Sequence, residues 1–436
     1  MTSLVDWAAA VVSAPPHIVL PIRPRAAIVD VPGPLVLLNA FELGDENALL
    51  VVADDGGQRW VVPSVSNDRG LARAIPGDGT AAAFVGALSR PREGDRFRLR
   101  SWHMESLRDE RPIPVDQTNE SVVVGERAVV KWHVRLPSDS EPVNPAADRM
   151  SCLANADFPY SPRPWGFLEW HDGDRWLLVA SVVDYLPDAV DGWEWLVSDV
   201  ASAATGVAPM STAVAPVRDV GRIVALLHAT LASGGADEVG PDAVQQWRLA
   251  CESDLADALL LLDGMELERL RDRAEQIQAF FDSLNDIPSA VVIDTHADLH
   301  IGQVLRYGTP PNYAITDFDG NPVQGVSPTT LRQPAAADVA GMLASLDHVG
   351  RVVLRHTPSV DAQSVRWWLE QAQDAFLSEY RVTLAGAGCS NLLDERLLAP
   401  FRLRQECKEF IYAVKFLPHW RYVADEALRD LLPDKE

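Results

Sequence analysis

The stretch VVIDTHADLHIGQVLRYGTPPNYAITDFDGNPV (residues 291–323) lies between long helical patterns and combines short, strand-like apolar runs with clusters of polar residues. Gln303 follows Asp298 by five residues, and Asp317 follows Asp298 by nineteen, at the start of the sequence DFDG. Carboxylates and an amide gathered between apolar runs are typical of a reactive site. We therefore expect the chemistry of this protein to lie in this stretch.

The apolar pattern of the chain differs on the two sides of this stretch. Residues 1–100 contain short apolar runs separated by turn signals such as DDGG, and they predict a strand-rich N-terminal cap. Residues 101–190 predict a small intermediate lobe of sheet with one short helix, in which SVVVGERAVVKWHVRL forms two strands around a Gly125-Glu126 turn. Residues 191–436 carry apolar residues mainly at helical spacing. The fold class predicted is α+β.

The charge of the chain restricts its partners. It contains 38 Lys and Arg residues against 62 Asp and Glu residues, a net charge of -24, which repels nucleic acids and anionic membranes. The N-terminal sequence has no basic segment before its apolar run, and no apolar run reaches about 18 residues. We expect a cytoplasmic protein without a nucleic-acid or membrane partner, and the oligomeric state stays open. A nucleotide site in so acidic a chain must supply its own cations.

Phosphoryl transfer requires a carboxylate near the accepting hydroxyl, oxygen ligands for Mg²⁺ and a cation on the nucleotide phosphates. HADLHIGQVLR and ITDFDGNP resemble motifs of actinobacterial maltokinases, which are aminoglycoside phosphotransferase-like kinases. DQTNESVVVGERAVVKWHVRL resembles the phosphate-loop and lysine segment of the same family, and DYLPDAVDGW resembles its inter-lobe connection. The resemblance covers about residues 115–435. It implies a protein-kinase-like bilobal fold that binds ATP and Mg²⁺ in the cleft between the intermediate lobe and a helical C-terminal lobe.

Carried over to this sequence, the resemblance gives each position in the reactive stretch a role. Asp298 is expected to be the catalytic base, and Gln303 and Asp317 are expected to hold Mg²⁺ through oxygen atoms. Lys131, on a predicted strand, is expected to contact the nucleotide phosphates. These residues supply the groups that phosphoryl transfer requires.

The resemblance also implies further contacts to the nucleotide. Asp148 stands where the family usually has a Glu that pairs with the strand lysine. The loop QTNES lacks glycine, so Thr118 and Ser121 are candidates for phosphate contact through their hydroxyls. Adenine is expected to bind backbone groups of the connection near Val183 and Tyr185.

The sugar site is expected near Asp298 and the last long helix. In LRQECKEFIYAVKFLPHWRY, Glu409, Tyr412 and Phe416 lie at i, i+3 and i+7 on one helical face. Aromatic surface beside a carboxylate suits an amino sugar, and this ending, with Asp319 and Asn321 in place of two Glu residues, resembles the glucosamine kinases of actinobacteria. That resemblance implies phosphorylation of the 6-hydroxyl of glucosamine. The expected substrate-binding residues are Asp298, His300, Asp319, Glu409, Tyr412 and Trp420.

Other interpretations stay open at this point. Within the same family, maltose with its anomeric 1-hydroxyl or an aminoglycoside is an alternative acceptor. His296, Asp298 and His300 alternate and could begin a zinc site of a metallohydrolase. A pseudokinase-like module that binds nucleotide without turnover is the alternative that is not an enzyme. We interpret His228 as a packed helix residue, His296 as a brace of the catalytic loop, and Asp338 as a helix N-cap or first-turn acid.

Overall fold

The computed structural model describes residues 4–15, 19–20, 33–44, 46–67, 70–113, 119–320 and 332–433. The chain forms two compact units, and the boundary between Pro187 and Asp188 falls within the predicted inter-lobe connection. The predicted sites at Thr118 and Asn321 lie outside the described residues. The division of the first unit at residue 100 into a cap and an intermediate lobe stays a prediction.

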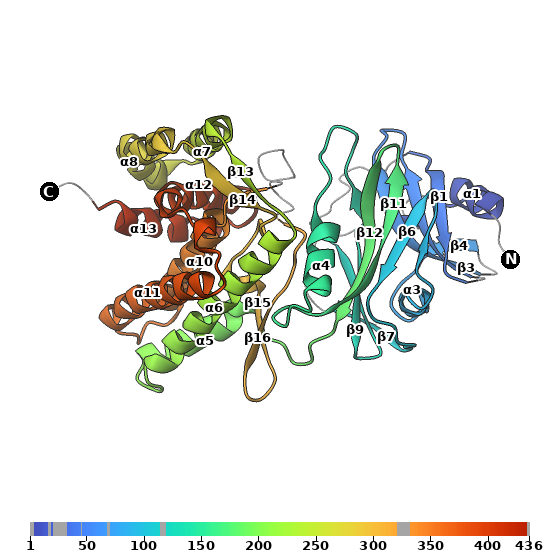
Figure 1. Ribbon diagram of the computed structural model, residues 1–436, viewed down its shortest axis with the longest axis horizontal. Coiled ribbons are helices and arrows are strands. Elements are labelled where there is room, and N and C mark those ends of the chain that lie inside the picture. The colour runs from blue at the N-terminus through green and yellow to red at the C-terminus, as the bar shows by residue number, and fades with distance from the viewer. Residues whose placement is uncertain are drawn as a thin grey trace. The chain divides into compact units, whose positions relative to one another are not determined.

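The first unit is built mainly from antiparallel strands (Figure 1). One sheet has the order β1-β2-β3-β10, with β4 beside β3, and a seven-stranded sheet has the order β5-β6-β11-β12-β9-β8-β7. The elements are α1 (Leu4–Ser13), β1 (Val36–Glu42), β2 (Asn47–Ala53), β3 (Arg59–Asn67), β4 (Gly70–Arg73), α3 (Thr80–Ala87), β5 (Arg92–Glu93), β6 (Phe97–Ser101), β7 (Glu110–Pro112), β8 (Glu120–Val124), β9 (Ala128–Trp132), β10 (Arg135–Leu136), α4 (Ala146–Asn155), β11 (Pro164–Asp172) and β12 (Arg175–Asp184).

The predicted hairpin around Gly125-Glu126 is present as β8 and β9. Gly125 has φ 57° and Glu126 has φ 53°, so both are left-handed, within a connection of three residues between the paired Val124 and Ala128. The short helix of this region is α4. Two helices in residues 1–100, α1 and α3, were not predicted, although the alanine-rich run of α3, TAAAFVGA, has high helix propensity.

One hydrophobic core spans the predicted boundary at residue 100. It joins Phe84 and Leu99 to Trp132, Trp165 and Leu168, all of which are at most 3% exposed. A separate cluster packs Trp7 and Val11 of α1 beneath the smaller sheet. Because apolar burial is the main stabilising term in folding, this continuous core holds the strands of the seven-stranded sheet in place.

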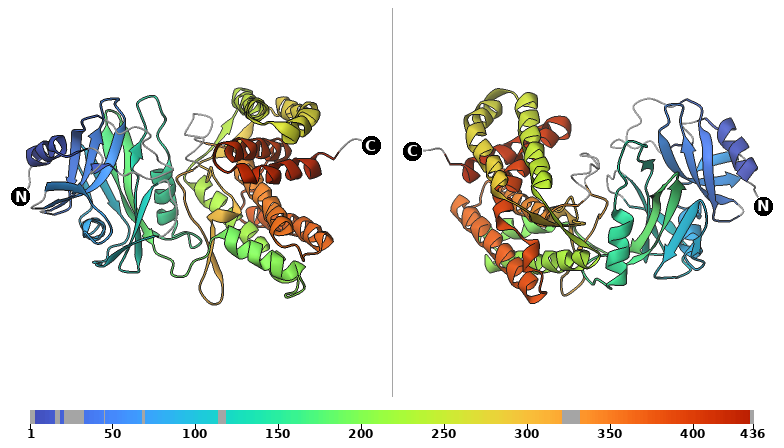
Figure 2. Two further views of the ribbon diagram at one scale, coloured as in Figure 1. Left: turned by 180° about the vertical axis from the view of Figure 1, so that it is seen from behind. Right: turned by 45° about the horizontal axis from the view of Figure 1, so that its top comes forward.

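The second unit is mainly helical, and Figure 2 shows its helices from two further sides. No helix within the described residues is long and apolar enough to cross a membrane. The elements are α5 (Gly192–Ala204), α6 (Ser211–Ser233), β13 (Ala236–Val239), α7 (Pro241–Leu261), α8 (Gly264–Asp282), η2 (Ser283–Asp286), β14 (Ala290–Ile293), η3 (Ile301–Gln303), β15 (Val304–Tyr307), β16 (Asn312–Ile315), α10 (Ala336–His356), α11 (Ala362–Gly386), η4 (Ser390–Leu392), η5 (Glu395–Leu397), α12 (Leu398–Phe416), η6 (Pro418–Trp420) and α13 (Arg421–Leu431).

A buried ion pair joins α10 to α12 in the core of this unit. His348 Nε2 lies 3.0 Å from Glu406 Oε2, and the two residues are 2% and 0% exposed. Burial alone would lower the pKa of His348, but the Glu406 carboxylate outweighs this effect and raises the pKa to about 9. The imidazole is therefore protonated at neutral pH.

This ion pair makes the stability of the protein depend on pH. Because the pKa of His348 is higher in the folded chain than its usual 6.5, the stabilisation is complete below pH 6.5 and is lost as the pH rises through 9. We expect the free energy of unfolding to fall by up to about 3 kcal/mol over this interval. His348→Gln should be less stable at pH 6.5 and should flatten this dependence, as measured by urea unfolding. His356→Gln, at the exposed end of α10, is the control, and an unchanged pH dependence in His348→Gln would contradict the assignment.

Candidate active site

The reactive stretch begins within β14, and two of its residues, one in the loop after β14 and one after β16, have a left-handed backbone. Ala297, directly before Asp298, has φ 69°, and Asp317 has φ 64°. The left-handed region is costly for residues other than glycine, so surrounding contacts must hold these conformations. Asp298 is half-buried and Asp317 is exposed. Such strain is concentrated at functional sites in proteins.

Three residues on one face of α10 support this loop. Asp338 accepts hydrogen bonds from the backbone N–H groups of His296 (2.7 Å) and Ala297 (3.0 Å). Ser345 Oγ accepts from the Ile301 N–H at 2.9 Å. Between them, a Cβ atom at Gly341 would lie 2.6 Å from the Leu299 carbonyl oxygen, so this close approach requires glycine. Residues 338, 341 and 345 share a helical face, which therefore contacts the loop along its length.

Asp338 is in turn held by a buried histidine. His228 Nε2 lies 3.1 Å from Asp338 Oδ2, and His228 Nδ1 lies 2.6 Å from the Tyr380 hydroxyl. Since a carboxylate only accepts, the Nε2–H of His228 donates to Asp338, and Nδ1 forms the second hydrogen bond, with the Tyr380 hydroxyl. Burial alone would raise the pKa of Asp338, but the hydrogen bond from His228 and those from the loop lower it. The interpretation of Asp338 as a simple first-turn acid was therefore incomplete, while His228 is packed as expected.

The two predicted Mg²⁺ ligands come from neighbouring positions of a small hairpin. β15 and β16 pair so that the Thr316 N–H donates to the Gln303 carbonyl at 3.0 Å, and Asp317 is the next residue. His296 Nε2 donates to the Thr316 carbonyl at 2.8 Å, which confirms the predicted bracing role of this histidine. No group of three His, Cys, Asp or Glu side chains is arranged to hold a metal in the part of the chain described here, so the structure gives no support to the zinc alternative.

Trp193, which the sequence analysis missed, connects two residues of the predicted sugar site. Its ring centre lies 6.3 Å from that of His300 and 5.9 Å from that of Trp420. The His300 Nδ1 accepts from the Gly302 N–H at 3.1 Å, and a Cβ atom at Gly302 would lie 2.6 Å from the Trp193 ring. The sequence signal that could have found Trp193 is its place in DGWEW, where it is the last residue of the predicted connection DYLPDAVDGW.

The α12 face predicted to bind the sugar lies in the same unit. Glu409 accepts a hydrogen bond from Gln405 at 2.9 Å, and the Tyr412 and Phe416 rings are in contact, 5.2 Å apart. Burial and Arg404 lower the pKa of the neighbouring Lys408 to about 8, while the carboxylates of Asp254 and Asp298 oppose this shift. Asp298 therefore acts electrostatically on α12, the helix that carries Glu409.

In the first unit, the predicted phosphate-binding residues lie in one row across the seven-stranded sheet. The strand register pairs Ser121 with Lys131, Lys131 with Ser181, Ser181 with Phe167, and Phe167 with Arg100. Directly paired residues of antiparallel strands point to the same face. Phe167 packs against α4, so the half-buried Lys131 projects from the face that α4 covers.

The remaining nucleotide-binding candidates lie near this row. Asp148 is exposed in the first turn of α4, and it contributes, after Glu169 and Glu93, to raising the pKa of Arg98. Its pairing with the strand lysine stays a prediction. Val183 lies near the end of β12, and the Tyr185 N–H donates to the Arg127 carbonyl at 2.8 Å. The Tyr185 N–H is thus already used within the first unit, and the binding of adenine at this connection stays a prediction.

The fold and the order of these motifs define a protein-kinase-like phosphotransferase. Over 434 residues the chain is 45% identical to the glucosamine kinase of Streptacidiphilus jiangxiensis, with 99% of both chains covered. It is 39% identical over 408 residues to the glucosamine kinase of Mycolicibacterium smegmatis, with 92% of this chain and 99% of that one covered. The chain belongs to the glucosamine kinase family.

A solved structure agrees with this assignment. A glucosamine kinase in complex with glucosamine, ADP and inorganic phosphate matches with a TM-score of 0.89 and 44% identity, over 99% of this chain and 100% of that one. No family model matches the sequence. The predicted family and fold class are thereby confirmed.

We expect Asp338→Asn to lower kcat by about 100-fold, because a loop displaced by as little as an ångström misplaces the reacting groups. The melting temperature should also fall, because the buried amide cannot accept all three hydrogen bonds, whereas ADP affinity should stay near that of the wild type. Steady-state kinetics and calorimetry provide the measurement. Asp374→Asn, on the exposed face of α11, is the matched control. A kcat for Asp338→Asn equal to that of the control would rule out the positioning role.

Proposed function

We propose that this protein transfers the γ-phosphate of ATP to the 6-hydroxyl of glucosamine. The observation that carries the proposal is the likeness over nearly the full length to a glucosamine kinase whose structure holds glucosamine and ADP. The support from the sequence itself is the order of Lys131, Asp298, Gln303 and Asp317 along the chain.

In the proposed mechanism Asp298 acts on the acceptor. Its carboxylate accepts the proton of the sugar hydroxyl as the oxygen attacks the γ-phosphorus. The bond from the γ-phosphorus to the bridging oxygen breaks, and ADP leaves. The hydrogen bonds from His296 and Ala297 to Asp338 fix the backbone before Asp298, so the carboxylate needs little reorganisation during the reaction.

The phosphates are bound by groups of two kinds. Lys131 supplies the positive charge on the nucleotide that an acidic chain otherwise lacks. Gln303 and Asp317 offer oxygen atoms from adjacent hairpin positions, a donor set that fits Mg²⁺. When bound, Mg²⁺ neutralises charge that develops on the phosphates.

The acceptor site combines an aromatic wall with a carboxylate. Trp193 lies beside both His300 and Trp420, and the three rings offer a surface for the apolar face of a sugar ring. Glu409, oriented by Gln405, receives the ammonium group of glucosamine through a charge-assisted hydrogen bond. This assignment explains a preference for an amino sugar over maltose.

Asp298→Asn should lower kcat by a factor of about 100 to 10,000, the range typical of a lost general base. Nucleotide affinity should stay near that of the wild type, because the substitution retains the size of the side chain. ADP release and calorimetric ADP titration measure the two effects. A variant with near-normal turnover would remove Asp298 from the mechanism.

Glu409→Gln tests both which acceptor the protein phosphorylates and whether Glu409 binds its ammonium group. ADP release from ATP and Mg²⁺ is measured with glucosamine, glucose, N-acetylglucosamine, maltose and an aminoglycoside, and product mass verifies phosphate addition. The wild type should prefer glucosamine. The variant should raise KM for glucosamine about 10-fold to 100-fold, because the ammonium group loses a charged partner, and leave KM for glucose nearly unchanged.

The other outcomes of this panel are equally informative. A preference for maltose in the wild type would return the protein to the maltokinase interpretation. If no acceptor gave ADP release despite tight ATP binding, a nucleotide-binding module without turnover would be favoured. An equal rise of KM for glucosamine and glucose would place Glu409 outside the ammonium site.

A further inference from the structure

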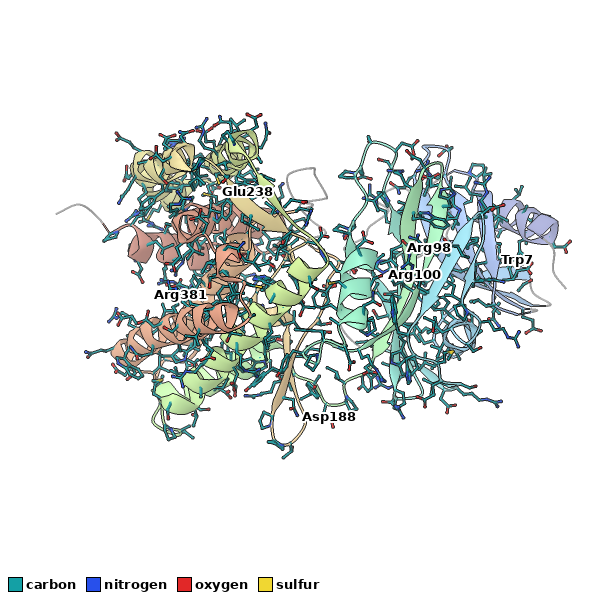
Figure 3. The ribbon with its side chains drawn as sticks, in the orientation of Figure 1. Trp7, Arg98, Arg100, Asp188, Glu238 and Arg381 are labelled. Atoms are coloured by element: carbon teal, nitrogen blue, oxygen red, sulfur yellow. The ribbon has the colours of Figure 1, made fainter. Side chains whose placement is uncertain are left out.

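Helix α11 contributes no residue to the proposed reaction, but one of its side chains reaches the support of the catalytic loop. Tyr380 is fully buried, and its hydroxyl lies 2.6 Å from Nδ1 of His228, whose Nε2 lies 3.1 Å from Asp338. The next residue, Arg381, is exposed on the outside of α11, where it pairs with Glu395 (Figure 3). The chain of buried hydrogen bonds thus runs from α11 through α6 to α10.

Close packing of α11 on α6 sets the distance between Tyr380 and His228. A Cβ atom at Gly221 would lie 2.4 Å from the Phe376 carbonyl oxygen, so α6 approaches α11 closely only because glycine stands at this position. The two residues of this contact lie about two turns before His228 and about one turn before Tyr380, on the same helical faces. The packing of the two backbones therefore fixes where the hydroxyl meets the imidazole.

A second buried hydrogen bond joins the same two helices. Trp368 is fully buried, and its Nε1–H donates to the Ala213 carbonyl at 3.0 Å. This bond ends on the backbone of α6. The Tyr380 bond differs from it, because the histidine partner of Tyr380 is also bonded to Asp338, which holds the backbone directly before Asp298. Substitutions at the two donors can therefore separate support of the loop from packing of the helices.

The direction of the Tyr380 hydrogen bond follows from the number of donors. The pKa of Tyr380 is raised well above its usual 10, first by burial and then by the Asp338 carboxylate, so the hydroxyl keeps its hydrogen. This hydroxyl makes a hydrogen bond with His228 and with no other residue that the structure describes. If Nδ1 also carried a hydrogen, the Tyr380 O–H would be buried without an acceptor, which is costly. Every polar atom of the chain is paired only when Nδ1 accepts.

We propose that Tyr380 is a positioning residue of the catalytic loop: its hydroxyl donates to Nδ1 of His228 and holds the ring in the neutral form that donates from Nε2 to Asp338. Without this donor the proton can move to Nδ1, and the lone pair of Nε2 then faces the carboxylate of Asp338. The carboxylate loses one of its three hydrogen bonds and holds the loop less firmly. The alternative is an imidazolium that donates to both neighbours, in which Tyr380 contributes only packing. The proposal rests on the proposed role of Asp298.

The test compares two substitutions in α11 that each remove one buried hydrogen bond to α6. Tyr380→Phe removes the donor to His228, and Trp368→Phe, the matched control, removes the donor to Ala213. For both variants and the wild type, the melting temperature is measured first. kcat and KM for ATP and glucosamine are then measured well below the lowest melting temperature. NMR of protein with ¹⁵N-labelled histidine reports the form of the His228 ring, and His228→Gln assigns its signals.

We expect both variants to melt at a lower temperature than the wild type. Only Tyr380→Phe should lower kcat, by about tenfold, which is less than the effect of Asp338→Asn because Asp338 itself stays in place. KM should change little, because positioning acts on the reacting geometry. His228 should be neutral with its proton on Nε2 in the wild type and in Trp368→Phe, and should change form in Tyr380→Phe. In an Asp338→Asn background, Tyr380→Phe should lower kcat no further, since both residues act through one chain.

Equal kcat values for Tyr380→Phe and Trp368→Phe, or an imidazolium signal from His228 in the wild type at neutral pH, would overturn the proposal. Effects of Tyr380→Phe and Asp338→Asn that multiply in full would overturn the route through Asp338. The NMR result tests the Tyr380 hydrogen bond without turnover. A failure of this proposal is therefore distinguished from a failure of the proposed function, which would show as a wild type that is inactive with glucosamine.

Discussion

The buried carboxylate of Asp338 is the interaction that holds the loop before Asp298 in its conformation. Its two oxygens accept from the backbone N–H groups of His296 and Ala297, directly before Asp298, and from His228. A carboxylate that accepts several hydrogen bonds stays ionised even when buried, and the lowered pKa of Asp338 agrees with this. These hydrogen bonds to Asp338 offset the conformational cost of the left-handed Ala297, which turns the chain immediately before Asp298.

Two glycines let helices α10 and α5 pack closely against the backbone of this loop. Gly341 lets α10 approach Leu299, and Gly192 lets α5 approach the Ile301 carbonyl, where a Cβ atom would overlap the oxygen. The second contact also fixes Trp193, the residue after Gly192, beside His300. The aromatic wall of the proposed sugar site and the catalytic loop are therefore positioned by the same few contacts.

Several positively charged side chains lie at defined positions in this acidic chain. Lys131 projects from one face of the seven-stranded sheet, and Arg98 and Arg100 lie on the same face nearer its edge. In the second unit the protonated His348 balances Glu406 in the core beside α12, the helix that carries Glu409. His348 is thus neutralised by its carboxylate partner, whereas Lys131 is the cation expected to offset the acidic net charge for a phosphate ligand.

The sequence by itself determined the helical C-terminal part, the strand that carries Lys131 and the family, because these depend on local periodicity and on residues at short, fixed spacing. It also predicted the reactive stretch and the roles of its residues, and these roles stay predictions. It could not reveal Trp193, the anchoring role of Asp338 or its support by Tyr380. Asp338 lies 42 residues from His296, and Tyr380 lies 152 residues from His228. Contacts over such separations form only when helices pack, and no local pattern in the chain specifies which polar side chains that packing brings together.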